Sequence, residues 1–161
     1  MEVATGKVAG RRQLKFDTLA AALADAESLA AAERNARLTR LGNWSLGQAL
    51  GHLAAWSDYS YTGAPMKPPF FIRWMLRTQK NKFLNSPMRA GLKIPRVTGG
   101  TYSTEAMPSD EGLARLRRAF DRLQREAPTT PNVIFGPLTH EQWIALNLRH
   151  AELHLSFFAA Q

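Results

Sequence analysis

The sequence predicts an all-α protein: an antiparallel bundle of four long helices, with one extra helix and a long loop inserted. Apolar residues recur at helical spacing in four separate segments of the chain. Each of these segments begins at a serine, threonine or aspartate, which are residues that cap helix N-termini well. No segment shows the alternation of apolar and polar residues that is typical of a half-buried strand.

Length and composition predict a single domain. The chain has 161 residues, of which 45% are hydrophobic, and both values are ordinary for one globular unit with its own core. We expect residues 1–16 to form an extended or partly ordered lead-in and residues 17–161 to form one helical bundle domain. No stretch approaches the roughly 20 apolar residues that span a bilayer, and the N-terminus lacks the apolar core of a signal peptide. These features favour a soluble, cytoplasmic protein.

The first two long helices are predicted from their caps and apolar stripes. Asp17 can cap a helix that runs to about Ala32 and is rich in alanine, a strong helix former. Ser45 and Gln48 match a capping box, in which each side chain satisfies a backbone N–H of the other residue. That second helix is expected to run to about Tyr61 and to bury its apolar face.

The middle of the chain is expected to hold the extra helix and the long loop. A third helix is predicted from Phe70 to about Phe83, after two consecutive prolines. From Asn85 to Pro108 the chain is rich in glycine and proline and should be irregular. Loops of this length in compact domains are often lids or binding segments.

The last two long helices complete the predicted bundle. Ser109 is expected to cap a helix that runs to about Glu126. Thr139 and Gln142 match a second capping box and open a final helix to about Phe158.

The positive charge of the chain is concentrated in one segment. The formal net charge is +8, and residues 67–96 hold eight basic residues and no acidic one. Such a segment attracts an anionic ligand, a nucleic acid or a membrane surface, although it can equally be a solvated surface. Aromatic side chains interleave with these cations, and we expect them to pack against the bundle. Membrane or nucleic-acid binding is therefore the least favoured function.

Three of the four histidines are candidates for a metal site. His150 and His154 are four residues apart, which places both imidazoles on one face of the final helix, together with Leu153. His52 belongs to the apolar face of the second long helix. Buried imidazoles need partners for their nitrogens, and a divalent metal held by three of them keeps a coordination position free for water or substrate. The alternative is that they are hydrogen-bonded core residues.

The remaining chemistry of the chain limits this site. There are no cysteines, so protein ligands to a metal must be nitrogen or oxygen atoms, which suit zinc, nickel, iron or copper. Ala151 follows His150, where the metalloprotease motif His-Glu-x-x-His has its catalytic glutamate, so we reject that function. Glu152 is expected at the surface or behind the ligands. His140, in the first turn of its helix, is left out of the ligand set.

The chain resembles the DinB/YfiT-like superfamily over nearly its whole length, from about Arg12 to Phe158. The resemblance rests on Gly-His-Leu-Ala-x-Trp at 51–56 and on the His-x-x-x-His pair of the last helix. It is closest to an uncharacterised branch, a domain of unknown function, which shares the motifs at 42–45, 67–69, 135–138 and 149–152. That branch commonly ends its motif in a double histidine, where this chain has Leu153 before His154.

The resemblance implies a fold, a ligand set and a class of chemistry. It implies an up-down-down-up four-helix bundle, often a homodimer, in which His52, His150 and His154 bind a divalent transition metal, with zinc, nickel or iron favoured. Characterised relatives are thiol transferases that use low-molecular-weight thiols and a thiol-dependent isomerase. We therefore expect a metal-dependent transferase or hydrolase that acts on a small molecule, with a low-molecular-weight thiol as a candidate cosubstrate. Lys67, Arg73 and Arg96 are the candidates to bind an anionic group of that substrate.

Two alternatives remain open at the level of the sequence. The protein can be a non-catalytic metal or small-ligand binding module of the same fold, since no general acid or base stands out near the histidines. A basic protein that binds membrane surfaces or nucleic acids is the second alternative.

Overall fold

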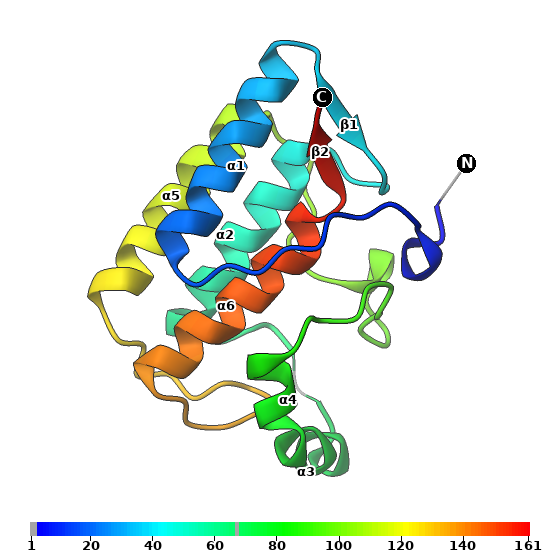
Figure 1. Ribbon diagram of the computed structural model, residues 1–161. Coiled ribbons are helices and arrows are strands. Elements are labelled where there is room, and N and C mark those ends of the chain that lie inside the picture. Colours follow the sequence, from blue (N-terminus) through cyan, green and yellow to red (C-terminus); the bar gives the residue numbers. More distant parts are fainter. Residues whose placement is uncertain (1–2, 67) are drawn as a thin grey trace.

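Four long helices form the main body of the protein (Figure 1). The computed structural model describes residues 3–66 and 68–161. The long helices are α1 (Leu19–Arg34), α2 (Leu46–Thr62), α5 (Ser109–Arg125) and α6 (His140–Leu155). Two shorter helices, α3 (Phe70–Thr78) and α4 (Lys80–Asn85), lie together at one end of the bundle. The colours of Figure 1 show that α1 and α6 run in one direction and α2 and α5 in the other. The mostly helical fold predicted from the sequence is therefore confirmed.

The two predicted capping boxes are both present. Ser45 with Gln48, and Thr139 with Gln142, each make the two reciprocal side-chain to backbone bonds. The first helix differs from the prediction, because Thr18 and not Asp17 is its cap: the Thr18 hydroxyl accepts from the Ala21 N–H at 3.1 Å. Ser109 is likewise not a cap but the first residue of α5, which follows Pro108. In α1 the cap lies one residue after the expected position, where its side chain reaches a free N–H of the first turn.

Helices α2 and α5 approach closely because glycines line their contact. A Cβ atom on Gly112 of α5 would lie 2.7 Å from the Gly47 carbonyl oxygen and 3.0 Å from the Leu50 side chain. Side chains longer than hydrogen would therefore push the two backbones apart. The core beside this contact is built from fully buried leucines of both helices, such as Leu50 and Leu116, each 0% exposed.

A small sheet closes one end of the bundle. Strand β1 (Leu38–Arg40) pairs antiparallel with β2 (Phe158–Ala160), with Thr39 opposite Ala159. No strand was predicted here, and the last helix was predicted to continue to about Phe158, whereas α6 ends at Leu155. Strands of three residues are too short to show an alternating pattern, and pairing with a distant segment overrides local helix propensity.

The segment before α1 runs along α6 and is held there by a buried ion pair. Glu152 is 5% exposed, and its carboxylate lies 2.6 Å from Arg149. The Phe16 N–H donates to Glu152 at 2.6 Å, and Arg149 donates to the Phe16 carbonyl oxygen at 2.8 Å. The surface position considered for Glu152 is therefore wrong. Its backbone partner lies 136 residues away in sequence, so local spacing does not reveal it.

The inserted segment contains two helices where the sequence predicted one. The break falls at Gln79, whose φ of −100° and ψ of 7° are not helical. α3 buries none of its side chains, and Phe70 and Trp74 are 82% and 71% exposed. The expectation that the aromatic side chains pack against the bundle is therefore wrong for these two, whereas Phe83 is half-buried and its ring centroid lies 5.5 Å from that of Phe135. None of the helices in the described residues is long and apolar enough to cross a membrane.

Candidate metal centre

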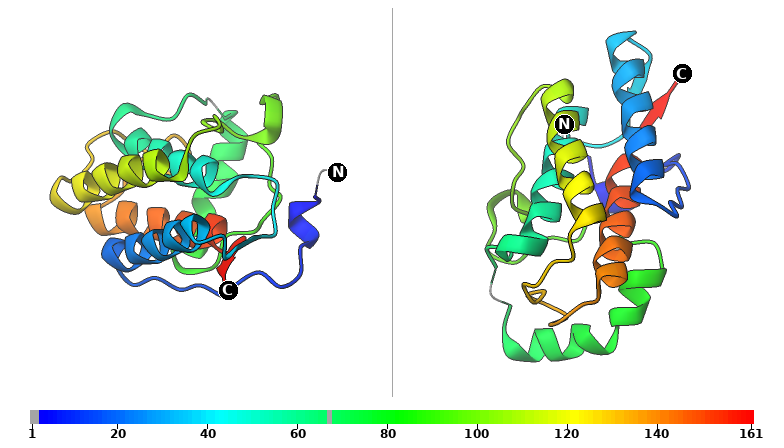
Figure 2. Two further views of the ribbon diagram at one scale, coloured as in Figure 1. Left: turned by 90° about the horizontal axis from the view of Figure 1, so that it is seen from above. Right: turned by 90° about the vertical axis from the view of Figure 1, so that its left-hand side faces the viewer.

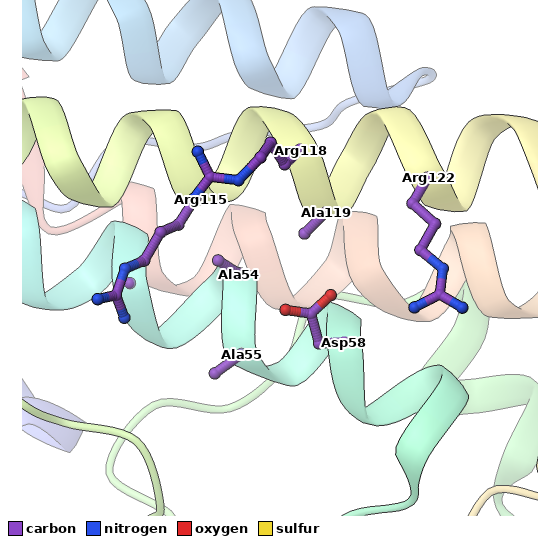
Figure 3. A pocket seen from close by; sticks show the side chains of 8 residues that line it. Ala54, Ala55, Asp58, Arg115, Arg118, Ala119 and Arg122 are labelled. Carbon is purple, nitrogen blue, oxygen red and sulfur yellow. The ribbon is translucent and has the colours of Figure 1, made fainter.

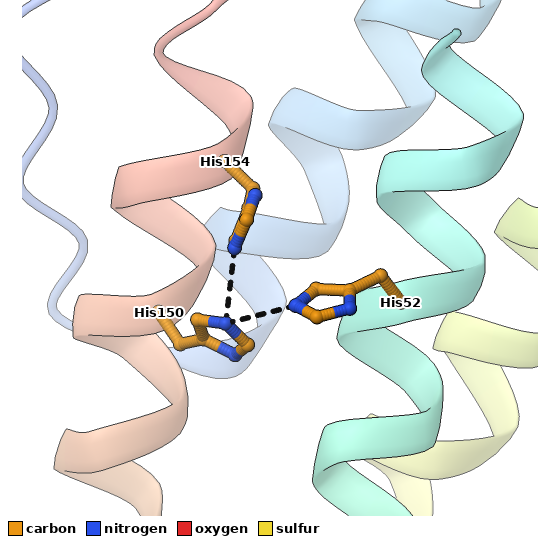
Figure 4. Close-up of side chains that lie close together, drawn as sticks. All are labelled: His52, His150 and His154. Carbon is orange, nitrogen blue, oxygen red and sulfur yellow. Dashed lines mark hydrogen bonds between the residues drawn. The ribbon is translucent and has the colours of Figure 1, made fainter. Parts of the chain in front are cut away.

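The structure brings His52, His150 and His154 together between α2 and α6 (Figure 4). The four-residue spacing places His150 and His154 on one face of α6, and His52 points toward them from α2. The His150 Nε2 atom lies 3.2 Å from His52 Nε2 and 3.0 Å from His154 Nε2. The ligand atoms of the three side chains all lie within 4.8 Å of one another, so the cluster could hold a metal ion.

The long loop before α5 determines which nitrogen of His52 carries the proton. His52 Nδ1 lies 2.9 Å from the Tyr102 carbonyl oxygen and 3.3 Å from the Ser103 carbonyl oxygen. A carbonyl only accepts, so Nδ1 is the donor, and Nε2 presents its lone pair to the cluster. Ser103 has a φ of 57°, an uncommon left-handed conformation for a residue with a side chain, and its hydroxyl bonds the Tyr59 hydroxyl at 2.7 Å.

Protons alone do not satisfy the three nitrogens. His150 Nε2 is within hydrogen-bonding distance of two other Nε2 atoms, yet a neutral ring nitrogen offers either one proton or one lone pair. Without a proton it faces the lone pair of His52, and with a proton it can donate well to only one neighbour. A divalent cation removes this conflict, because it accepts the lone pairs of all three nitrogens. The donor set therefore fits a metal.

The electrostatics of the cluster keep the imidazoles neutral. Burial lowers the pKa of His52 to about 4, against the opposing effect of the Tyr102 and Ser103 carbonyls. Burial, and then the neighbouring histidines, hold the pKa of His150 and of His154 well below the usual range. His52 is 1% exposed, whereas His150 and His154 are half-buried and keep access to a cavity. All three rings are therefore neutral and ready to bind a metal near pH 7.

Two tryptophans surround the cluster, and neither was predicted from the sequence to take part in the site. The Trp44 ring stacks on His154 at a centroid distance of 5.1 Å and an interplanar angle of 4°. Trp56 meets His150 edge-on at 5.5 Å. The spacing of four between His52 and Trp56 was a signal for a shared face, but Trp44 precedes α2 and could not be placed that way.

A large cavity adjoins the three histidines. It has a volume of about 1610 Å³, and its wall includes residues of the N-terminal segment, of α2 and α6, and of the inserted segment. Most of the wall is apolar. Among the described residues that line it, none is acidic and four are lysine or arginine: Lys7, Arg89, Lys93 and Arg96.

The residues predicted to bind an anionic group divide into three cases. Arg96 lies in the cavity wall. Arg73 is half-buried on α3 and does not belong to the described part of that wall; its Nε atom has no hydrogen-bond acceptor among the described residues. Lys67 lies outside the described residues. His140 stands apart from the cluster, at the start of α6, where its Nε2 contacts the Leu123 carbonyl oxygen at 2.5 Å.

A second, smaller hollow lies on the opposite face of α2, against α5 (Figure 3). It has a volume of about 400 Å³ and is lined by Asp58 and the arginines 115, 118 and 122. Arg115 pairs with Glu111 and Arg122 pairs with Glu126. Burial raises the pKa of Asp58, while Arg122 and Arg118 lower it. The charges of this hollow are thus largely compensated within the protein, and the hollow offers no preformed site for a ligand.

Comparison with known proteins gives the chain a family. Residues 8–161 match the family described as "Protein of unknown function (DUF1569)". The chain belongs to the DUF1569 family. A search of curated proteins and a search of solved structures gave no significant match. This DUF1569 protein therefore contains a three-histidine cluster that could hold a metal ion, and its family names no function.

Proposed function

We propose that this DUF1569 protein is a metal-dependent enzyme that acts on a small molecule, with His52, His150 and His154 holding a divalent transition metal. The observation that carries the proposal is the convergence of three Nε2 atoms. No arrangement of protons satisfies the hydrogen bonding of all three atoms at once. Zinc, nickel and iron all suit an all-imidazole ligand set. When bound, such a metal lowers the pKa of a water or thiol at its open position and so supplies a nucleophile near neutral pH.

The residues around the histidines suggest how a substrate is bound. Apolar walls suit an apolar body, while Arg96 and the other cations of the cavity suit an anionic group. The Trp56 indole Nε1 is buried, has no acceptor among the described residues, and is available to an acceptor on the substrate. Because the chain has no cysteine, a thiol nucleophile would arrive as a cosubstrate. Transfer of a low-molecular-weight thiol and hydrolysis are the two reactions that fit this arrangement.

A non-catalytic binding protein is the second candidate. The observation that favours it is the lack of any aspartate or glutamate among the described residues of the cavity wall. General acid–base catalysis commonly uses such a side chain or a histidine free of other duties. A protein that binds metal without turning over electrophiles in the presence of thiols would support this candidate over the enzyme.

We further propose that the family is related to the DinB/YfiT-like superfamily and shares its homodimeric assembly. The support is the direction of the four long helices and the origin of the histidines, one from the second long helix and two from the last. The proposal predicts a two-fold assembly in solution, which light scattering on the purified protein tests.

Elemental analysis of the natively purified protein, without a histidine tag, tests the metal site. We expect about one equivalent of a transition metal in the wild type and its loss in the His150→Ala variant. His140→Ala is the matched control, because this histidine lies on the same helix but outside the cluster, and it should keep the metal. A wild type that stays metal-free after reconstitution with zinc, nickel, iron and manganese would show that the histidines are core residues.

A further inference from the structure

The outward face of α3 exposes large apolar side chains that nothing in the described chain covers. Phe70, Phe71, Trp74 and Met75 are 82%, 57%, 71% and 45% exposed. Phe70 and Trp74 are four residues apart, as are Phe71 and Met75, so the four side chains form two adjacent rows on one face of the helix. An exposed apolar face of this kind on a soluble fold marks a contact with something else.

The chain segment that contains this face carries positive charge only. Lys80 and Lys82 follow on α4, and Arg73 and Arg77 lie on α3 itself, where the Arg73 Nε atom is buried and the Arg77 Nε atom donates to the Ile134 carbonyl oxygen at 3.4 Å. No acidic residue occurs between positions 67 and 96. The partner of this face should therefore have an anionic surface with an apolar layer beneath it.

We propose that the outward face of α3 binds the surface of an anionic lipid membrane. The aromatic side chains and Met75 enter the boundary between headgroups and acyl chains, and the neighbouring cations, above all the lysines of α4, attract the anionic headgroups. The nine residues of α3 lie flat on the surface, as expected of an amphipathic helix. The contact is peripheral and does not depend on a metal in the histidine cluster.

A second copy of the chain matches this face less well. A two-fold contact through α3 would bring the cations of α3 and α4 near the same cations of the other copy, where like charges repel. A lipid surface supplies the opposite charge and an apolar layer together. Charge complementarity therefore favours the membrane.

The same helix also borders the cavity of the metal centre. Ile72 and Leu76, on the inner side of α3, line the cavity, and Phe71 belongs both to its wall and to the exposed face. Docking through α3 would place one wall of the cavity against the membrane. Amphiphilic molecules dissolved in the lipid would then have a short route to the histidines.

Co-sedimentation with large unilamellar vesicles tests the proposal. We expect binding to phosphatidylcholine vesicles that contain about 30% phosphatidylglycerol at roughly 0.1 M salt, and much weaker binding at about 1 M salt. The double variant Phe70→Ser/Trp74→Ser should bind about tenfold or more weakly, because it removes two apolar anchors. Both side chains are largely exposed, so the variant should fold normally, which circular dichroism can verify.

Matched variants distinguish binding through this face from nonspecific binding of the protein to vesicles. Val3→Ser removes another exposed apolar side chain, and Arg118→Glu reverses a charge on α5; both should bind vesicles like the wild type. Lys82→Glu, which reverses an exposed charge on α4, should bind several-fold more weakly. A folded wild type that ignores anionic vesicles would overturn the proposal. Self-association that disappears in the Phe70→Ser/Trp74→Ser variant, or tighter binding to single-stranded DNA than to vesicles through the same residues, would overturn it in favour of another partner.

Discussion

The histidines of the cluster are positioned by two different regions, the helical bundle and the irregular loop before α5. His150 and His154 come from α6 in the core of the bundle, where spacing on one helix and buried packing set their positions. His52 comes from α2, but its ring is oriented by the carbonyls of Tyr102 and Ser103, in the irregular loop of the inserted segment. The bundle thus determines the positions of the three histidines. The inserted segment determines the orientation of the His52 ring and forms part of the wall of the cavity through which a ligand reaches the cluster.

The largest expected loss of stability comes from a substitution in the bundle, at the ion pair behind the α6 histidines. Glu152→Ala removes the partner of Arg149, which is 11% exposed, and also the acceptor of the Phe16 N–H. An uncompensated buried charge should cost about 3–5 kcal/mol of unfolding free energy. Urea denaturation measures it. Glu27→Ala, which breaks the exposed pair with Arg117, is the control and should cost about 1 kcal/mol or less. Equal losses would show that the buried pair does not anchor the N-terminal segment.

The same truncation in the two regions should have very different effects. Leu50→Ala in the core should lower the unfolding free energy by about 2–5 kcal/mol, because it leaves a cavity against α5. Leu92→Ala in the inserted segment removes a side chain that is 67% exposed and should change it by about 0.5 kcal/mol or less. Thermal and urea unfolding of both variants test the contrast. A comparable loss at Leu92 would mean that the insertion is part of the core.

Acid should destabilise the metal-free protein through the cluster. Folding lowers the pKa of His52 from about 6.5 to about 4, so the unfolded state binds the proton more tightly. Stability is therefore unaffected above pH 6.5, falls as the pH drops from 6.5 toward 4, and for His52 alone is lower by about 2 kcal/mol at pH 5. Urea unfolding across this range measures the loss. The His52→Gln variant should show a shallower decline, and an unchanged slope would contradict the assignment.

The smallest expected effect is on metal affinity and comes from a substitution that loosens the loop beside His52. Tyr59→Phe removes the hydrogen bond to the Ser103 hydroxyl and loosens the loop whose carbonyls orient His52. Loss of such an outer contact typically weakens metal affinity by about tenfold or more. Competition with a chromophoric chelator measures the affinity. Tyr61→Phe also loses one hydroxyl contact, to the Glu126 carbonyl, and should leave affinity unchanged. Equal affinities of the wild type and Tyr59→Phe would show that the loop does not tune the site.

The bundle elements were predictable because their signals are local. Capping boxes at Ser45 and Thr139 and the spacing of His150 and His154 lie within a few residues of sequence. The contacts that escaped prediction join distant segments. The carbonyl of Tyr102 meets His52 across 50 residues, and Glu152 meets Phe16 across 136. Periodicity predicts that α3 is amphipathic, but it does not show that its aromatic side faces away from the bundle.

The tryptophans around the cluster give the protein an optical readout of its own occupancy. The chain has four tryptophans, and two of them, Trp44 and Trp56, lie against ligand rings at centroid distances of 5.1 and 5.5 Å. At that range a paramagnetic ion such as nickel or copper quenches indole emission, whereas closed-shell zinc does not. Loading can therefore be followed by intrinsic fluorescence without any added dye, and loss or retention of emission distinguishes open-shell ions from zinc.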